Sequence, residues 1–425
     1  MPSLKNFLAD SFSLSVALAE IDLSDPELWL APRDHRERVF RTLRDEAPVQ
    51  FFEEVEFPPF AKGPGYFAVT RYEDIWMASR NPQLFCSGQG TVIPDMPIEI
   101  AEFFGSMISM DDPRHHRLRS IVAKAFTPKV LSQIEGYVRE KADGIVDTVL
   151  EKYPDGACDF VDEVAAPLPL QIICEMMGIP DEDERQVFAW TNTILGAGDP
   201  DYAADFGALL EQSMAMNAYA IELGTDRLAN PRDDLTTALM HAEVDGERLT
   251  TAEFGSFFIL LVVAGNETTR NAISHGIKAL TDHPDQRALW WDDFPGITKT
   301  AVEEIVRWAS PVINFRRTAT EDTEIRGVPI KAGEKIVLWY NSANRDERTF
   351  ADPFTFDVRR DPNPQVGFGA GGPHFCLGAH LARLEITVMF RELFRRLPDI
   401  AVTGEPAMLR SGFIHGIKRM PCAWK

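Results

Sequence analysis

Phe368-Gly-Ala-Gly-Gly-Pro-His-Phe-Cys-Leu-Gly378 is a glycine-rich stretch that carries one cysteine, Cys376, to the start of an apolar, helix-like run over Ala379–Leu397. Glycine lets the backbone adopt turns that other residues disfavour and approach a flat ligand closely. A sulfur at a helix N-terminus faces the positive end of the helix dipole and free amide donors, here expected from Leu377 and Gly378. Both effects favour a thiolate, so the stretch predicts a metal ligand.

Haem iron is the leading candidate for that metal, because a cysteine thiolate is one of its axial ligands in proteins. Three other interpretations stay open from this stretch alone. A lone cysteine is most often a buried structural residue. Gly367, Gly369 and Gly372 match the G-x-G-x-x-G pattern of dinucleotide loops, although Asp361-Pro-Asn-Pro364 excludes a regular strand leading directly into the loop. A nucleophilic thiol would need a separate base and an oxyanion hole.

The composition is that of an acidic globular protein. The chain has 425 residues, 45% of them hydrophobic and 25% charged, and no linker, repeat or low-complexity tract divides it. Its net charge of −22 argues against nucleic acid or an anionic membrane surface as a partner. Five scattered cysteines without a C-x-x-C motif favour neither zinc nor a disulfide framework. With no apolar run of membrane-spanning length, we expect a cytoplasmic protein without a membrane anchor.

Periodicity and chain breakers predict mainly helices. The expected elements are a helix over Asp25–Glu46, paired strands over Val49–Phe52 and Tyr66–Thr70, a helix over Tyr72–Ser79, a long irregular segment over Asn81–Ile108, a helix with Pro113 in its first turn, a break between helices over Thr191–Ala203, and strands within Glu324–Tyr340.

The longest predicted helix begins at Thr250, which forms a capping box with Glu253, and ends at Asp282, before His283-Pro284. Its apolar middle predicts a buried central helix, and Ala264-Gly-Asn-Glu-Thr-Thr269 lies inside it. Glycine in mid-helix costs about 1 kcal/mol relative to alanine, and a buried glutamate needs polar partners. The motif is a poor structural choice, so it predicts a function unless the polar residues face solvent.

Two pairs of charged residues share helix faces. His115 and Arg119 are four residues apart, and Glu304 and Arg307 are three apart. On their own, such pairs are most often solvated surface charges.

In this order and at these spacings, the motifs resemble those of cytochromes P450 from about Asp111 to the C-terminus. The resemblance implies a mainly α fold with a smaller β-rich region, as one triangular domain over residues 1–425. It also implies haem b between the Thr250–Asp282 helix and the Cys376 loop, with an apolar substrate above the haem.

The resemblance assigns a role to each motif. Cys376 is the axial ligand of the iron, and Glu267 and Thr268 are an acid–alcohol pair that delivers protons. His115, Arg119, Arg317 and His374 hold the haem propionates. Glu304, Arg307 and Arg360 form a buried structural triad. The expected substrate pocket comprises Phe104, Ile108, Leu260, Val263, Ala264, Val312 and Phe413. Phe413 belongs to a C-terminal turn over Ser411–His415 that is expected to touch the substrate.

The implied activity is insertion of one oxygen atom from O2 into a C–H bond. Phe368 stands eight residues before Cys376, where the usual P450 pattern has seven. A similar lengthened loop occurs in actinobacterial P450s that hydroxylate sterol side chains and methyl-branched lipids. This resemblance implies an elongated apolar substrate, a methyl-branched lipid or a sterol side chain, that is oxidised near a chain end. Alternatives are a peroxygenase that takes peroxide directly and a non-enzymatic haem-thiolate sensor or carrier.

The resemblance also implies electrons from NAD(P)H through a ferredoxin reductase and a ferredoxin. Basic residues on two segments, which meet beside the cysteine ligand in the P450 fold, predict a docking face for an acidic ferredoxin. They are Arg114, Arg117, Arg119, Lys124 and Lys129 in the first segment, and Arg383, Arg391, Arg395 and Arg396 in the second.

Overall fold

The computed structural model of the chain describes residues 15–123, 126, 128–196, 198–202, 205–244 and 246–425. The helices are α2 (Arg33–Glu46), α3 (Tyr72–Ser79), α4 (Ile98–Gly105), α5 (Arg114–Ala123), α6 (Pro128–Lys152), α7 (Pro167–Met177), α8 (Glu184–Leu195), α9 (Phe206–Ala229), α10 (Leu235–His241), α11 (Thr251–Asp282), α12 (Pro284–Asp292), α13 (Phe294–Ala309), α14 (Tyr340–Ala343) and α15 (Ala379–Arg396). The strands are β1 (Val49–Phe52), β2 (Tyr66–Val69), β3 (Phe85–Cys86), β4 (Ala157–Asp159), β5 (Asn314–Ala319), β6 (Thr323–Ile325), β7 (Val328–Ile330), β8 (Lys335–Trp339), β9 (Ala401–Val402), β10 (Ala407–Met408), β11 (Ile417–Arg419) and β12 (Pro421–Ala423). The fold is therefore mainly α with a smaller β-rich region, as the sequence predicts.

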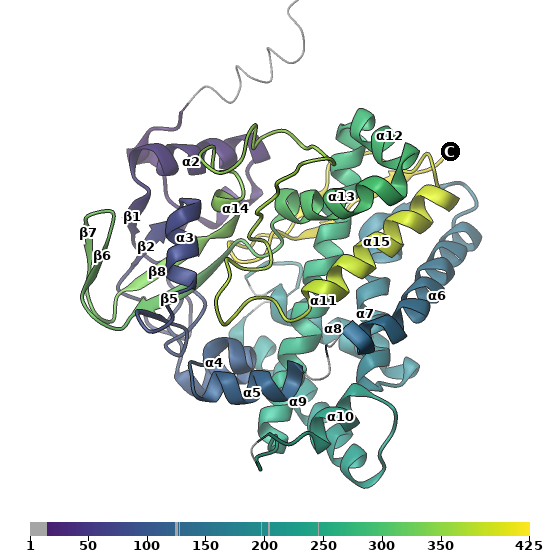
Figure 1. Cartoon of the computed structure of the whole chain (residues 1–425), viewed down its shortest axis with the longest axis horizontal. Helices are drawn as coiled ribbons and strands as arrows, with labels where there is room; N and C mark the ends of the chain where they lie inside the picture. Colours follow the sequence, from purple (N-terminus) through teal and green to yellow (C-terminus); the bar gives the residue numbers. More distant parts are fainter. Residues whose placement is uncertain (1–14, 124–125, 127, 197, 203–204, 245) are drawn as a thin grey trace, which may run out of the picture.

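The β-rich region is built on a five-stranded sheet of order β1-β2-β8-β5-β3. β1 and β2 form the predicted antiparallel pair, and β2 pairs in parallel with β8. Along β8, Ile336 and Leu338 join one buried cluster while Val337 and Trp339 join another, because successive strand side chains point to opposite faces. One face packs on α3 and the other on α2 (Figure 1).

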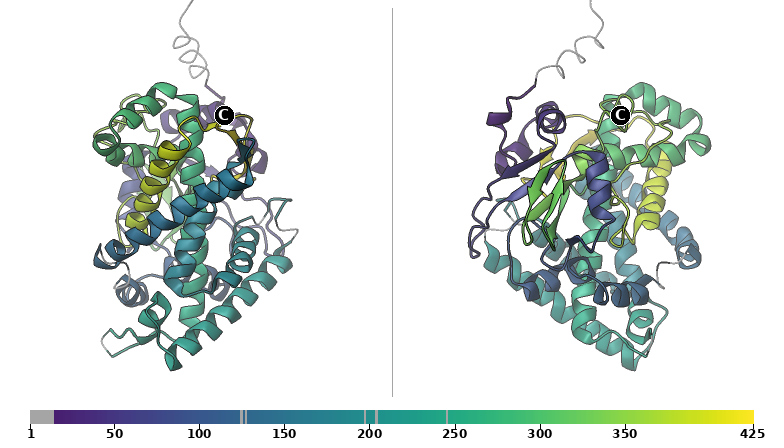
Figure 2. Two further views of the ribbon diagram at one scale, coloured as in Figure 1. Left: turned by 90° about the vertical axis from the view of Figure 1, so that its right-hand side faces the viewer. Right: turned by 60° about the vertical axis from the view of Figure 1, so that its left-hand side comes forward.

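The helical region is organised around α11, which packs against α7, α8, α9, α13 and α15. Figure 1 shows α11 crossing the molecule between α12 and α9, and the further views in Figure 2 keep the sheet on one side of it and α6 and α15 on the other. The predicted capping box is present, because the Thr250 hydroxyl accepts the N–H of Glu253 at 3.1 Å and the Glu253 carboxylate accepts the N–H of Thr250 at 2.9 Å. Both predicted ends of this helix are confirmed.

The predicted helix over Asp25–Glu46 is wrong as one element. The structure has a 3₁₀ turn over Pro26–Leu30 and then α2, which begins at Arg33. Pro32 lies between them, and proline disfavours a helical conformation in the residue that precedes it and has no N–H to donate. Pro32 therefore explains why the 3₁₀ turn and α2 are separate elements.

Three other boundaries differ from the prediction. The segment over 81–108 is not wholly irregular, since Pro97 caps α4 and a 3₁₀ turn follows over Ser106–Ser109. α8 continues to Leu195, so the break between α8 and α9 begins later than Thr191; Ala203 lies outside the described residues. α5 begins at Arg114, after Pro113, whose carbonyl accepts the N–H of Arg117 at 3.1 Å.

A buried ion cluster joins α13 to the segment that leads into the cysteine loop. Glu304 bonds Arg307 through two contacts of 2.7 Å, and its Oε2 accepts from Arg360 Nε at 3.0 Å. Glu304 and Arg307 are fully buried. The guanidinium groups of Arg307 and Arg360 also donate to backbone carbonyl oxygens of the 344–355 segment. The accepting carbonyls belong to Asn344, Ala351, Asp352, Pro353 and Thr355. The cluster therefore fixes this irregular backbone against a helix.

Within the part of the chain that the structure describes, no helix combines the length and apolar character needed to cross a bilayer.

We expect Glu304→Gln to destabilise the protein by about 3–5 kcal/mol, because the substitution leaves two buried guanidinium groups without their shared charge partner. Urea unfolding monitored by circular dichroism measures the loss. Lys62→Ala, which breaks the exposed pair with Glu53, is the matched control and should change the unfolding midpoint little. Equal stability of Glu304→Gln and the wild type would contradict the structural role of the cluster.

Candidate active site

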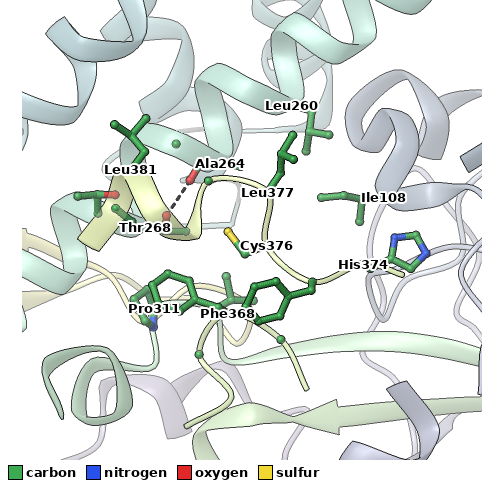
Figure 3. Close-up of a pocket in the computed structure, with 18 of the residues that line it drawn as sticks. Ile108, Leu260, Ala264, Thr268, Pro311, Phe368, His374, Cys376, Leu377 and Leu381 are labelled. Carbon is green, nitrogen blue, oxygen red and sulfur yellow. Dashed lines mark hydrogen bonds between the residues drawn. The ribbon is translucent and has the colours of Figure 1, made fainter. Parts of the chain in front are cut away.

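The cysteine loop is closed by a backbone hydrogen bond from Cys376 to the carbonyl of Phe368, at 2.9 Å. Gly372 adopts a φ of +79°, and a Cβ there would lie 2.1 Å from the carbonyl oxygen of Ser79. Glycine is therefore required at this position by both backbone conformation and close approach. The loop delivers Cys376 to the N-terminus of α15, and its sulfur points into a pocket (Figure 3).

The groups around Cys376 shift the pKa of its thiol in opposite directions. Burial raises the pKa of the Cys376 thiol, whereas a hydrogen bond from the Gly378 amide and the charges of Arg119 and Arg383 lower it. The predicted amide donor is thus present at Gly378, but the net shift favours the thiol rather than the thiolate. A bound metal ion would reverse that balance by displacing the proton.

The pocket is a cavity of about 210 Å³ between α11 and the cysteine loop. Figure 3 shows Ala264 and Thr268 of α11 on one side of Cys376 and Phe368 on the other. Gly265 also lines the cavity, and a Cβ at this position would lie 2.8 Å from Ile173 of α7. The mid-helix glycine therefore has a packing role, and α11 continues through it as a regular helix.

Basic side chains gather at one part of the lining. Arg119, Arg317 and His374 all face the cavity. The His115 ring lies 4.3 Å from the His374 ring, and its buried Nε2 has no hydrogen-bond partner among the described residues. Burial and the charge of Arg317 lower the pKa of His374 to about 2, so this imidazole is neutral. The two arginines give the region a positive potential that suits carboxylate groups.

Asn266, Glu267 and Thr269 of the α11 motif are buried, and half-buried Thr268 faces the cavity, which excludes a solvent-facing patch. Glu267 is 1% exposed, and its Oε1 accepts from Arg270 and, at 3.4 Å, from Asn271. Arg270 also donates to Asn192 of α8 at 3.0 Å. Thr268 lines the cavity and donates to the carbonyl of Ala264 at 2.7 Å (Figure 3). The two residues of the expected pair thus face different surroundings, because Glu267 is not part of the lining.

Four of the seven predicted substrate residues line the cavity, namely Ile108, Leu260, Ala264 and Val312. The other three are not among the residues that line it. Val263 packs in the main core, Phe104 against Phe103, and Phe413 against the lining residue Phe315 at 5.4 Å. His415, at the end of the predicted C-terminal turn, instead contacts Ala309 and His275.

Glu385 lines the cavity and was missed from the sequence. It is 1% exposed, and its Oε1 has no partner among the described residues. Burial raises its pKa to about 8, against a hydrogen bond from Thr269 that lowers it. An acidic residue between Leu384 and Ile386, on the apolar face of the predicted 379–397 helix, is the signal that could have identified it.

Comparison with known proteins identifies this arrangement. A family model described as Cytochrome P450 matches residues 296–398. A methyl-branched lipid omega-hydroxylase of Mycobacterium tuberculosis is 56% identical over 409 residues, which cover 96% of each protein. The chain belongs to the cytochrome P450 family. A steroid C26-monooxygenase of Rhodococcus jostii is 43% identical over 414 residues, which cover 95% of this P450 and 84% of that protein.

A solved structure of a Mycobacterium marinum cytochrome P450 in complex with pseudoionone superposes on this P450 with a TM-score of 0.88. It is 44% identical, and the match covers 95% of this chain and 98% of that one. The predicted resemblance and fold class are confirmed, and the relatives identify the protein as a P450 monooxygenase.

The residues of this site fit the haem that the family binds. A thiol at the base of an apolar cavity offers an iron ligand, and the basic side chains at the edge offer partners for the two carboxylates of the porphyrin. The unpartnered Nε2 of buried His115 is explained if a carboxylate group binds beside it. Cys376, Arg119, Arg317, His374 and His115 are therefore the residues that would hold the group.

Ionisation of Glu385 should make the P450 less stable as the pH rises. The pKa of Glu385 is about 8 in the folded protein, above the usual value of 4.5. The neutral carboxyl therefore contributes its full share to the free energy of unfolding below pH 4.5, and this share is lost as the pH rises towards 8. We expect Glu385→Gln to gain about 2 kcal/mol relative to wild type between about pH 6 and about pH 8. Urea unfolding of the holoenzyme across this range measures the difference, and exposed Glu405→Gln serves as control. A difference that does not vary with pH would contradict the raised pKa.

Proposed function

We propose that this P450 hydroxylates a methyl-branched lipid or a sterol side chain near a chain end, with one oxygen atom taken from O2. The observation that carries the proposal is the lining of the cavity, where apolar side chains such as Ile108, Leu260 and Val312 outnumber the basic ones. Such a wall holds an elongated apolar substrate by burial of surface and offers a polar substrate few hydrogen bonds. The names of the two relatives agree with this substrate class.

Haem b, when bound, supplies the activation of O2, and the chain supplies its ligand and its protons. Cys376 Sγ is the proposed axial ligand. Thr268 Oγ1 is the group of the α11 motif that reaches the cavity, and it can pass a proton inward once its bond to the Ala264 carbonyl is released. Glu267 reaches Thr268 only when its carboxylate leaves Arg270 or through a bridging water, since it is paired away from the cavity.

We propose that electrons arrive from NAD(P)H through a ferredoxin reductase and a ferredoxin. Most of the basic groups expected to form a docking face are already paired with carboxylates, which lowers the charge of that face. Arg114 pairs with Glu102, Arg117 with Glu247 and Glu253, Arg383 with Glu303, and Arg395 and Arg396 with Asp143. Lys124 and the side chain of Lys129 lie outside the described part of the chain. The proposal therefore rests on the family rather than on a strongly basic surface. That residues 1–425 form one domain likewise stays a prediction.

Titration of the holoenzyme with methyl-branched fatty acids, a sterol and small polar aromatics tests the substrate class. We expect branched lipids and the sterol to shift the Soret band at micromolar concentrations, and mass spectrometry of turnover mixtures to find a chain-end alcohol. Leu260→Ala should weaken lipid binding about tenfold, or about 1.4 kcal/mol, through lost apolar contact.

Val263→Ala is the matched control for that titration. It shortens a neighbouring side chain on the same helix that does not line the cavity. Equal losses from the two substitutions would show that the cavity is not the lipid site. Binding of only the polar aromatics would overturn the substrate class.

We expect Thr268→Ala to uncouple the reaction, because the hydroxyl that passes protons into the cavity is removed. NADH consumption with a surrogate reductase system should continue, while hydrogen peroxide replaces most of the hydroxylated product. Ser274→Ala removes an equivalent hydroxyl on α11, which bonds the carbonyl four residues earlier but does not line the cavity. This control should stay coupled, and a coupled Thr268→Ala enzyme would remove Thr268 from the relay.

A further inference from the structure

Two cysteines far from the haem site face each other across a small sheet. β12 pairs antiparallel with β4, and Cys422 lies directly opposite Cys158 in that register. Their sulfur atoms are 3.7 Å apart, although the two residues are separated by 264 positions in the chain. Cys86 and Cys174 are buried elsewhere, and Cys376 lies at the haem site, so this is the close cysteine pair of the described residues.

The backbone already holds the two cysteines at a spacing that suits a disulfide. The flanking N–H groups of Phe160 and Trp424 donate across the ladder, to Met420 at 2.8 Å and to Gly156 at 3.0 Å. Counting by two from these residues makes Cys158 and Cys422 a hydrogen-bonded pair, for which the Cα atoms lie about 5.5 Å apart. Disulfides span Cα separations of about 4.4–6.8 Å. The Cα spacing therefore suits a disulfide, and closing the sulfurs from 3.7 Å to bonding distance needs side-chain rotation together with a small approach of the two strands, because a disulfide also holds its Cβ atoms about 3.5–4.5 Å apart.

The pair is also open to a small oxidant. β4 is an edge strand of the sheet order β4-β12-β9, and Cys158 is half-buried, whereas Cys422 is 1% exposed. The hydrogen bond between the thiols lowers the pKa of Cys422, and the same bond together with burial raises the pKa of Cys158. The hydrogen bond therefore favours the thiolate form of Cys422, which is the form that oxidation requires.

We propose that Cys158 and Cys422 form an oxidisable dithiol, which hydrogen peroxide converts into a disulfide. One thiol loses its proton and its sulfur attacks a peroxide oxygen, so that the O–O bond breaks and a sulfenic acid forms, while the hydroxide that leaves takes up the proton lost by that same thiol and becomes water. The second thiol then attacks that sulfur, and a second water leaves as the S–S bond forms. Two thiols and one peroxide give one disulfide and two waters.

The disulfide would fasten the C-terminal strand to the body of the helical region. β4 leads directly into a π-helical turn over Val161–Ala165 that packs on α11. β12 follows β11, where Lys418 pairs with Asp199 at 2.9 Å and with Asp201 at 2.7 Å in the segment between α8 and α9. Oxidation would therefore join β4 to β12 covalently, next to a turn that packs on α11 and a strand that is ion-paired to the α8–α9 segment.

Peptide mapping under non-reducing conditions tests the site in the holoenzyme. After treatment with hydrogen peroxide, we expect one cross-linked product that joins the peptides carrying residues 158 and 422, with a mass lower than their sum by two hydrogen atoms. Dithiothreitol should reverse it. The oxidised protein should also melt at a higher temperature and exchange the amides of residues 417–423 more slowly than the reduced protein.

Single variants separate the two steps. Cys158→Ser and Cys422→Ser should each lose the cross-link, and the remaining cysteine should give a sulfenic acid that dimedone traps. Cys174→Ser, which removes a buried cysteine outside the pair, should form the cross-link as the wild type does. A parallel treatment with diamide, an oxidant of dithiols that contains no peroxide, reports whether the geometry permits the bond.

Two results would overturn the proposal. Absence of the cross-link with both oxidants would show that the strands do not allow the bond. A cross-link with diamide alone, while peroxide leaves both thiols reduced or oxidises Cys158 by itself to sulfinic acid, would show that the pair does not respond to peroxide.

Discussion

A buried carboxylate that must be neutralised determines where the sulfur of Cys376 stands. Glu304 has no access to water and is balanced by Arg307 on its own helix and by Arg360, which comes from irregular backbone. Leaving any of these charges unpaired in the interior would cost several kcal/mol, so α13 and the 351–363 segment can sit together in only one way. Six residues after Pro362-Asn-Pro364 begins, the chain enters the loop that carries Cys376. The position of the sulfur thus depends on a buried ion cluster that lies outside the cavity.

The cavity divides its polar groups by function. The basic side chains come from α5, β5 and the cysteine loop, and the apolar side chains come from α11, α15, the cysteine loop and the segments before α5 and β5. One cavity therefore offers basic partners to the carboxylates of a flat group and apolar surface to an apolar chain. Glu267 adds a third environment, since Arg270 ties it to α8 rather than to the cavity. Any proton that it supplies depends on how firmly α8 holds that arginine.

The parts of the fold that depend on local sequence signals could be predicted from the sequence. A capping box and a proline define both ends of α11, and the glycine spacing around Cys376 is read directly from the chain. The direction in which each side chain of a helix points was less predictable. Leu260 and Val263 are both apolar and three residues apart, yet of these two only Leu260 lines the cavity. That difference depends on how α11 rotates against its neighbours. The partners of the arginines were not predictable either, because Arg117 meets Glu253 and Arg383 meets Glu303 from distant parts of the sequence. The same limit applies to Cys158 and Cys422.

The order of the strands has a consequence for synthesis. β2 hydrogen-bonds to β8 in the centre of the sheet, with Tyr66 opposite Lys335. Ribosomes add about 5–20 residues per second, so the hairpin of β1 and β2 waits on the order of tens of seconds before its neighbour exists. During that time the edge of β2 is an unpaired strand edge, a surface that invites association with other chains. Cys376, the proposed iron ligand, emerges later still. The nascent N-terminal hairpin is therefore the part of this chain where protection by a chaperone would matter most before β8 is made.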